Sequence, residues 1–300
     1  MSDTVGFIGL GVMGRPMAKH ILAKGYAVVA YNRSRMAVDD LVAAGAVAAA
    51  SPADVARRAT ILITMVPDTP DVERVIEGEG GILEGLQAGT VLIDMSSISP
   101  ATTRRLAHVV AARGGTMLDA PVSGGEIGAI NGTLSIMVGG KADALARVRA
   151  VLECMGNPER IIHVGEEPGA GQVCKVCNQI AIGGALAGVS EAFALARKSG
   201  VDASRVREAL LGGFAASRVL EVHGERMLKR NYVPGFRSRL YQKDLRLATE
   251  AAASAGVAIP ATAVVAQLLN SLVAAGGGDL DYSALGTVLF ELAGLDKDAL

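Results

Sequence analysis

Residues 4–14 read TVGFIGLGVMG, an apolar run that ends in three glycines with G-x-G-x-x-G spacing. The spacing alone is weak evidence, but a first strand that enters a glycine-rich loop and then a helix predicts a dinucleotide-binding fold. Gly9 permits the tight turn, Gly11 lets the backbone approach a pyrophosphate, and Gly14 lets the helix pack on the strand. A glycine-rich turn without a ligand is the alternative. The predicted cofactor contacts in this loop are Gly9, Leu10, Gly11, Met13 and Gly14.

Short apolar runs alternate with helical patterns along the first half of the chain, which predicts a parallel sheet covered by helices. The strand-like runs are 4–10, 26–31, 59–66, 90–96, 115–122, 134–140 and 160–165. The helical patterns between them are 14–25, 36–46, 51–59 and 99–114. From Gly169 onward only helical periodicity appears, with turns expected at Pro234, Pro260 and Gly276–Gly278. We therefore predict an α/β fold class, with a Rossmann-type parallel-sheet domain at 1–164 and an all-α domain at 165–300.

The charge balance argues against several classes of partner. The formal net charge is −1, and no basic block is longer than the pairs Arg57-Arg58 and Arg104-Arg105. Nucleic acid is therefore not expected, because no basic field is available for a phosphate backbone. The N-terminus lacks the basic stretch and apolar segment of a secretion signal, and the longest nearly uncharged run, 180–189, is shorter than the roughly 20 residues that span a bilayer. We expect a cytoplasmic protein without a membrane span.

Three cysteines, Cys154, Cys174 and Cys177, cannot all pair, and an intracellular chain keeps them reduced. Cys174 and Cys177 form a C-x-x-C, which can indicate a metal site or a thioredoxin-like redox pair. Because a helical pattern surrounds them and no second pair or nearby histidine accompanies them, we interpret them as two small buried side chains. No His/Asp cluster stands at ligand spacing, so no metal site is expected.

The second strand ends in YNRSR, at the position where an NAD-binding enzyme usually carries an acidic side chain. Asn32 stands there instead, followed by Arg33, Ser34 and Arg35. A carboxylate repels a ribose 2′-phosphate, whereas a guanidinium binds it in bidentate fashion. We therefore favour NADP(H) as the cofactor, with NAD as the other possibility, and predict that Asn32, Arg33 and Ser34 contact it. A solvated loop after a strand is the alternative for both arginines.

Three later loops also follow strands, at the edge where ligands gather in an open parallel sheet. Met65, Val66 and Pro67 follow one strand, and Ser96 follows the next. These four residues are predicted to border the cofactor, although ordinary loop chemistry explains them equally well. In the third loop, Ser123, Gly124 and Gly125 place a hydroxyl beside two glycines, which suits a small carboxylate. A plain Gly-Gly turn accounts for the same letters.

Lys175 is the single full charge between Glu167 and Glu191. An unpartnered buried ammonium is costly, so an apolar helix should not carry one without a reason. At helical spacing Asn178 and Gln179 share a face with Lys175, which favours a polar pocket. The alternative is a lysine whose stem lies on the helix while its ammonium reaches water.

Four ordered motifs resemble the β-hydroxyacid dehydrogenases, which include 3-hydroxyisobutyrate dehydrogenase, tartronate semialdehyde reductase (2-hydroxy-3-oxopropionate reductase), and glyoxylate and succinic semialdehyde reductases. The motifs are GFIGLGVMGRPMA, DAPVSGG, GAGQVCKVCN and Lys243-Asp244-Leu245, and they cover essentially the whole chain. The resemblance implies a Rossmann domain joined to a helical domain by a long helix. It also implies subunits that associate through the helical part as a homodimer or homotetramer, and a small semialdehyde or hydroxyacid as substrate.

The resemblance also assigns roles to residues. It makes Lys175 the catalytic lysine, places Lys243 against the cofactor, and gives the substrate carboxylate to Ser123, Gly124 and Gly125. Phe236 and Asp244 border the substrate site by the same carry-over. Reduction builds negative charge on a carbonyl oxygen, so a proton donor is needed there, and desolvation lowers a lysine pKa towards the working range. Asn178 and Gln179 are expected to orient the lysine and the substrate.

The branch within this family is read from individual positions. Gln179, where many members have Asn, resembles the tartronate semialdehyde reductase branch, as do LIDMSSISP and GTLSIMVGG. YNRS at 31–34 resembles the NADPH-using glyoxylate reductases instead. We expect reduction of tartronate semialdehyde, with 3-hydroxyisobutyrate dehydrogenase or glyoxylate/succinic semialdehyde reductase as alternatives. A non-catalytic NADP-binding protein and an imine reductase are the rivals from other classes.

Overall fold

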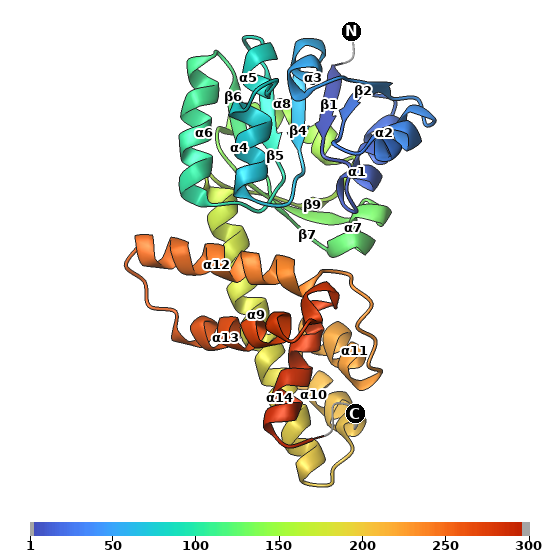
Figure 1. Ribbon diagram of the computed structural model, residues 1–300, viewed down its shortest axis with the longest axis vertical. Coiled ribbons are helices and arrows are strands. Elements are labelled where there is room, and N and C mark those ends of the chain that lie inside the picture. The colour runs from blue at the N-terminus through green and yellow to red at the C-terminus, as the bar shows by residue number, and fades with distance from the viewer. Residues whose placement is uncertain (1–2, 296–300) are drawn as a thin grey trace. The chain divides into compact units, whose positions relative to one another are not determined.

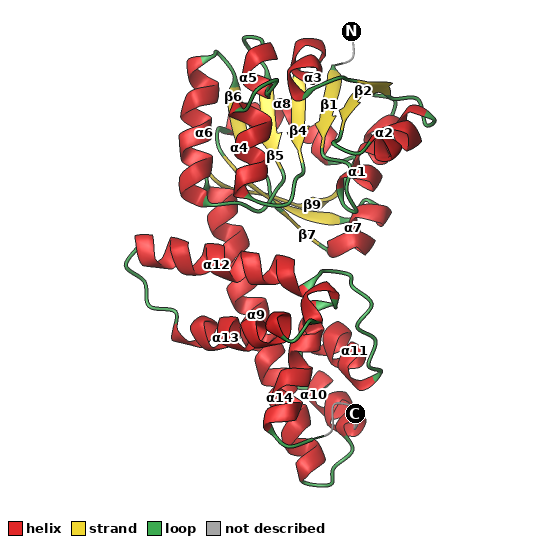
Figure 2. Ribbon diagram, viewed as in Figure 1, coloured by secondary structure: helices red, strands yellow, loops and turns green. Residues whose placement is uncertain are grey.

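The computed structural model describes residues 3–295, and these form two compact units that meet in sequence between Lys175 and Val176 (Figure 1). The first unit carries the sheet, and the second is helical (Figure 2). The predicted α/β class with an all-helical second part is confirmed. A helix of 29 residues, α9 (Ala170–Lys198), begins in the first unit and continues in the second.

The described part of the first unit forms one nine-stranded sheet in the order β3-β2-β1-β4-β5-β6-β8-β7, with β9 beside β8. All pairs from β3 to β6 are parallel, as alternation of strands and helices requires. The prediction of a wholly parallel sheet is wrong at β8, because this strand pairs antiparallel with both β6 and β7. The strands are β1 (Thr4–Ile8), β2 (Ala27–Tyr31), β3 (Val47–Ala48), β4 (Ile61–Thr64), β5 (Val91–Asp94), β6 (Thr116–Asp119), β7 (Val122–Ser123), β8 (Leu134–Gly139) and β9 (Gly156–Gly165).

Helices pack on both faces of this sheet because its strands are apolar on both sides (Figure 2). In β1, Phe7 joins the core under α1, α2 and α8, whereas Ile8 joins the core under α3, α4, α5 and α6. The period-2 alternation of side chains therefore builds two hydrophobic layers from one strand. The helices are α1 (Gly14–Ala23), α2 (Arg35–Val42), α3 (Pro52–Arg58), α4 (Thr69–Glu77), α5 (Ile82–Gly85), α6 (Pro100–Ala112), α7 (Gly125–Asn131) and α8 (Ala142–Leu152).

The second unit packs its helices around a separate core that includes Leu186, Phe193, Tyr241, Leu269 and Phe290. Two of the three expected turns coincide with element ends: Pro260 begins a helix, and Gly276 adopts a φ of 90°. Pro234 lies in an irregular stretch before α12. Besides α9, the elements are α10 (Ala203–Leu211), a π-helical turn (Leu220–Gly224), α11 (Glu225–Leu228), α12 (Ser238–Ser254), α13 (Pro260–Ala274), two short 3-10 turns (Gly277–Asp279 and Tyr282–Ala284) and α14 (Leu285–Leu292).

Helix α9 differs from the expectation that no segment is long enough to cross a membrane. Its apolar window reaches a mean hydropathy of 1.4, so length and composition alone would allow a span. The predicted apolar run, 180–189, was too short because it stopped at isolated polar residues, whereas the helix continues through them. Since 44% of the window is buried inside the protein and core helices of soluble proteins pass the same test, this is weak evidence for a membrane span.

Candidate active site

The glycine loop between β1 and α1 is crowded at two of its glycines and open at the third. A Cβ at Gly9, where φ is 99°, would lie 2.2 Å from the Met65 carbonyl oxygen, and one at Gly14 would lie 2.0 Å from the Gly9 carbonyl oxygen. Side chains are therefore excluded at both positions. At Gly11 a Cβ would meet nothing within 4 Å, so the backbone there faces open space. This geometry fits a pyrophosphate at the start of α1.

The end of β2 folds back on the same loop. Asn32 Oδ1 accepts a hydrogen bond from Leu10 N at 3.0 Å, and Asn32 Nδ2 donates to Ser34 O at 3.2 Å. Arg35 is paired with Asp39 at 2.7 Å along α2, whereas Arg33 and Ser34 are exposed. Asn32 thus shapes the loop, and the guanidinium of Arg33 lies at its surface.

The loops after β4 and β5 are tied to each other. Ser96, 1% exposed, accepts a hydrogen bond from Val66 N at 3.0 Å on its hydroxyl oxygen. At the end of β5, Asp94 Oδ1 accepts hydrogen bonds from Thr64 Oγ1 at 2.7 Å and from Ser96 N at 3.2 Å. Burial raises the pKa of Asp94 to about 6, although these hydrogen bonds oppose the rise. Sequence reasoning missed Asp94 as a site residue; a carboxylate that ends the apolar run VLI was the available signal.

A second buried carboxylate holds the beginning of α9. Asp119, at the end of β6, accepts from Gly169 N at 2.7 Å and from Gln172 N at 2.8 Å. Burial raises the pKa of Asp119, and these two amides act in the opposite direction. An acidic group at a helix N-terminus also interacts favourably with the helix dipole. Neither Asp119 nor Gln172 was predicted, because their sequence separation of 53 residues leaves no local pattern.

The junction between the end of β7 and the start of α7 contains Ser123, Gly124 and Gly125. It places one hydroxyl beside two glycines that have positive φ. Their φ values are 134° at Gly124 and 61° at Gly125, conformations that favour glycine. Gly124 is exposed and Ser123 is half-buried. The arrangement can present a hydroxyl and backbone amides to a small anion.

Lys175 lies on α9 at the end of the first unit, and only 8% of its surface is exposed. Its ammonium therefore belongs to a side chain that is largely withdrawn from water. This burial argues against the alternative, a lysine whose stem lies on the helix while its ammonium reaches water.

In the second unit, four predicted residues form a connected polar chain. Asn178 Nδ2 donates to Gln179 Oε1 at 2.8 Å, and Gln179 Nε2 donates to Asp244 Oδ2 at 2.5 Å. Asp244, 2% exposed, also forms an ion pair between Oδ1 and Lys243 Nζ at 3.1 Å. Tyr241, which was not predicted, donates from its hydroxyl to Gln179 O at 2.8 Å. The structure therefore brings Asn178, Gln179, Lys243 and Asp244 together around one buried carboxylate.

Phe236 stands in a loop that a different carboxylate holds. Asp281, 1% exposed, accepts from Gly235 N at 2.9 Å and from Phe236 N at 3.2 Å. The Phe236 ring meets Tyr241 and Tyr282 edge-on, at centroid distances of 6.4 and 5.8 Å. Asp281 was also missed, since its partners lie 45 and 46 residues away in sequence.

Two other sequence interpretations need comment. The interpretation of Cys174 and Cys177 as buried is wrong, because Cys174 is half-buried and Cys177 is exposed on α9. Residues 174 and 177 are three positions apart and so share one face of α9, and this face is not the one that the core covers. Within residues 3–295 no group of three or more His, Cys, Asp and Glu side chains could hold a metal ion.

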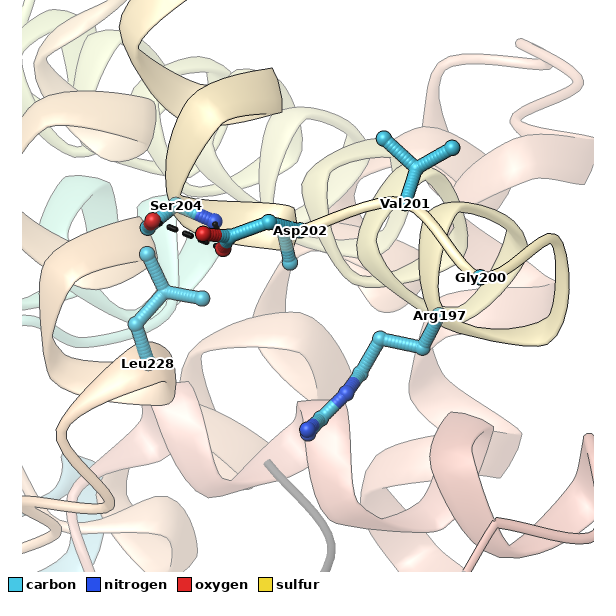
Figure 3. A pocket seen from close by; sticks show the side chains of 7 residues that line it. Arg197, Gly200, Val201, Asp202, Ser204 and Leu228 are labelled. Carbon is cyan, nitrogen blue, oxygen red and sulfur yellow. Dashed lines mark hydrogen bonds between the residues drawn. The ribbon is translucent and has the colours of Figure 1, made fainter.

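A cavity of about 490 Å³ lies in the second unit (Figure 3). Arg197, near the end of α9, is 22 residues beyond Lys175, which corresponds to roughly 33 Å along a helix. The cavity therefore belongs to a different place in the protein. Its lining is Arg197, Gly200, Val201, Asp202, Ala203, Ser204 and Leu228.

Two protein-family models match the chain in succession. Residues 4–165 match the NAD binding domain of 6-phosphogluconate dehydrogenase. Residues 169–289 match a model described as NAD-binding of NADP-dependent 3-hydroxyisobutyrate dehydrogenase.

Known proteins are similar to nearly the whole chain. The 2-hydroxy-3-oxopropionate reductase of Escherichia coli strain K12 is 48% identical, over 94% of this chain and 95% of that protein. The structure of Mycobacterium tuberculosis 3-hydroxyisobutyrate dehydrogenase with L-serine has a TM-score of 0.88 and 34% identity, covering 96% of this chain and 99% of that one. The structure of Psf3 in complex with NADP+ and 2-OPP has a TM-score of 0.85 and 28% identity, covering 95% and 100%. The likeness thus extends over both units.

Proposed function

The chain belongs to the 3-hydroxyisobutyrate dehydrogenase family of nicotinamide-dependent oxidoreductases, and from this premise we propose that it reduces tartronate semialdehyde to the corresponding hydroxyacid. The observation that carries the choice of substrate is the 48% identity to a 2-hydroxy-3-oxopropionate reductase over 94% of the chain. The resemblance of Gln179 to the tartronate semialdehyde reductase branch supports the same choice.

Residues of the first unit are proposed to hold the cofactor, which supplies the hydride when it is bound. The loop from Gly9 to Gly14 offers backbone amides to the pyrophosphate, with Leu10 and Met13 beside it. Arg33 and Ser34 are exposed at the end of β2, where a 2′-phosphate would lie, and Asn32 offers no carboxylate to repel it. This supports NADPH over NADH. The further proposed contacts are Met65, Val66, Pro67 and Ser96, together with Lys243 of the second unit.

Lys175 is proposed to be the general acid. The largely buried ammonium would hold a proton at Nζ and transfer it to the substrate oxygen as negative charge develops there. Burial of the Lys175 side chain supports this role because a proton donor shielded from bulk water interacts more strongly with charge that develops beside it.

Ser123, Gly124 and Gly125 are proposed to hold the substrate carboxylate, since successive glycines with positive φ can form a concave turn of backbone amides beside the Ser123 hydroxyl. In the second unit, Asp244 fixes the amide of Gln179, which in turn fixes Asn178. These side chains can then present polar groups in one orientation to a polar substrate. Phe236, held by Asp281, is proposed to form an apolar wall.

The two predicted domains are proposed to divide the work. Residues 1–164 would bind the cofactor, and residues 165–300 would contribute to the substrate site and to assembly as a homodimer or homotetramer.

A 3-hydroxyisobutyrate dehydrogenase is the second candidate function. The TM-score of 0.88 to the M. tuberculosis enzyme of that name favours it, as does the match of residues 169–289. The two functions share the fold and the proposed acid, so only the substrate distinguishes them.

The test is a comparison of kcat/KM for tartronate semialdehyde, succinic semialdehyde, glyoxylate and, in the oxidative direction, 3-hydroxyisobutyrate, each with both cofactors. We expect tartronate semialdehyde with NADPH to exceed every other combination by at least about tenfold. A higher value for 3-hydroxyisobutyrate would overturn the proposal in favour of the second candidate. Arg33→Ala should reduce the preference for NADPH, whereas Arg35→Ala, whose guanidinium is already paired with Asp39, is the matched control.

A further inference from the structure

A buried side-chain amide connects the loop after β5 with the first turn of α9. Gln172 Nε2 donates to Ser96 O at 2.8 Å, and Gln172 Oε1 accepts from Ile98 N at 3.1 Å. One amide thus pairs with the backbone of 96–98 at two points. Gln172 is 1% exposed, so water does not compete for either hydrogen bond.

The same turn of α9 is fixed from a second direction. Asp119 accepts the backbone amides of Gly169 and Gln172, so the position of Gln172 is set by its main chain as well as by its side chain. A Cβ at Gly171 would lie 2.3 Å from the Met137 carbonyl oxygen, which shows how closely the helix start approaches the strand end. The turn therefore has little room to shift while these contacts hold.

The hydrogen bonds of Gln172 connect two parts of the protein that the proposed reaction must align, the 96–98 loop and the first turn of α9. Lys175 is three residues beyond Gln172, within one helical turn. The Ser96 hydroxyl accepts a hydrogen bond from the amide of Val66, which joins the loops after β4 and β5. Gln172 consequently links the backbone of a proposed cofactor loop to the turn that precedes the proposed acid.

We propose that Gln172 is a positioning residue that fixes Lys175 relative to the 96–98 loop, an inference that rests on the proposed role of Lys175. Proton and hydride transfer require reacting atoms in a narrow geometry, and a displacement of about 1 Å can cost roughly a hundredfold in rate. Gln172 has no contact with the reacting atoms in this scheme. Its effect is therefore expected on kcat and not on binding.

Gln172→Met tests the hydrogen bonds at nearly constant side-chain length. We expect kcat to fall at least about tenfold, while the Kd for NADPH and the KM for tartronate semialdehyde stay within about threefold. Leu152→Ala, buried in α8 and outside this network, is the matched control for lost stability. It should lower Tm yet keep kcat near the wild-type value at a temperature where both variants are folded.

Gln172→Glu provides a readout that a merely structural role would not change. A protonated Glu can accept from Ile98 N and donate to Ser96 O like the native amide, whereas the ionised form repels the Ser96 carbonyl. Burial and the neighbouring Asp119 carboxylate favour the protonated form. The ratio of kcat for Gln172→Glu to kcat for wild type should therefore rise as pH is lowered from about 9 to about 6, while the ratio for Gln172→Met stays flat.

The inference is overturned if Gln172→Met keeps kcat within about twofold of wild type, or if the Gln172→Glu ratio does not change with pH. Lys175→Ala, measured in parallel, separates this outcome from failure of the proposed function. Loss of activity in Lys175→Ala with full activity in Gln172→Met removes only the positioning role. Full activity in Lys175→Ala removes the acid itself.

Discussion

Helix α9 is anchored differently on the two sides of Lys175. Before Lys175, Asp119 accepts backbone amides of Gly169 and Gln172. After it, the side-chain amide of Gln179 donates to Asp244. A carboxylate that binds main-chain amides fixes where a helix lies, whereas one that binds a side chain fixes which polar group the helix presents. The anchor before Lys175 therefore sets the position of α9, and the anchor after it sets the orientation of the Gln179 side chain.

The largest expected effect comes from Asp119→Ala, which would leave two buried backbone amides without an acceptor. Each such group costs about 1–3 kcal/mol, so the free energy of unfolding should fall by about 4 kcal/mol. Urea denaturation followed by circular dichroism measures it. Asp119→Asn keeps one carbonyl acceptor and should lose about half as much. Equal losses in both variants would show that the charge, and not the hydrogen bonds, anchors the helix.

Asp94 is a second buried carboxylate of the first unit and can be compared with Asp119. Its ionised form is disfavoured by burial. Its pKa is raised by burial to about 6 from 3.8, so the stability that it contributes is present below about 3.8 and is lost as the pH rises through about 6. Relative to wild type, Asp94→Asn should therefore gain about 2 kcal/mol in unfolding free energy between pH 4 and pH 7. Denaturation at these two pH values measures the gain, and a difference that is independent of pH would contradict it.

Gln179→Ala tests the anchor after Lys175. The variant leaves Asp244 Oδ2 without its amide donor, and we expect a loss of about 2 kcal/mol in unfolding free energy, because Lys243 remains as an ion-pair partner. Asn178→Ala, which removes only the bond to Gln179, is the control and should cost less than about 1 kcal/mol. If Gln179→Ala destabilises the protein as much as Asp119→Ala, the distinction between the two anchors fails.

The sequence predicted those parts of the fold that local patterns encode. The glycine loop after β1 and the helical second unit are confirmed, because conformational freedom at Gly9 and a 3.6-residue period are visible in a few neighbouring residues. Helix α4 was missed since the letters MVPDTPD resemble a loop. In the structure the same residues begin the helix: Asp68 caps it by accepting from Thr69 N, and Pro70 occupies its first turn. Strand β3 has only two residues and too little pattern to be found.

Residues that act through distant contacts were beyond prediction. Lys175 was noticed because a lone charge on an apolar helix is unusual in the sequence itself. The partners of Gln172 are 74 and 76 residues away, and those of Asp119 are 50 and 53 residues away. Only the folded sheet brings these atoms to one edge. The sequence also favoured burial of Cys177, because an apolar helix does not reveal which of its faces is covered.

The most direct measurement is single-turnover reduction of tartronate semialdehyde by Lys175→Ala with NADPH, beside Lys141→Ala as an exposed lysine control. The rate should fall at least about a hundredfold in Lys175→Ala, with a Kd for NADPH within about threefold of wild type, because general acid catalysis is typically worth this much. Lys141→Ala should match wild type in both. A Lys175→Ala enzyme that binds NADPH and keeps more than about a tenth of the wild-type rate would contradict Lys175 as the proton donor.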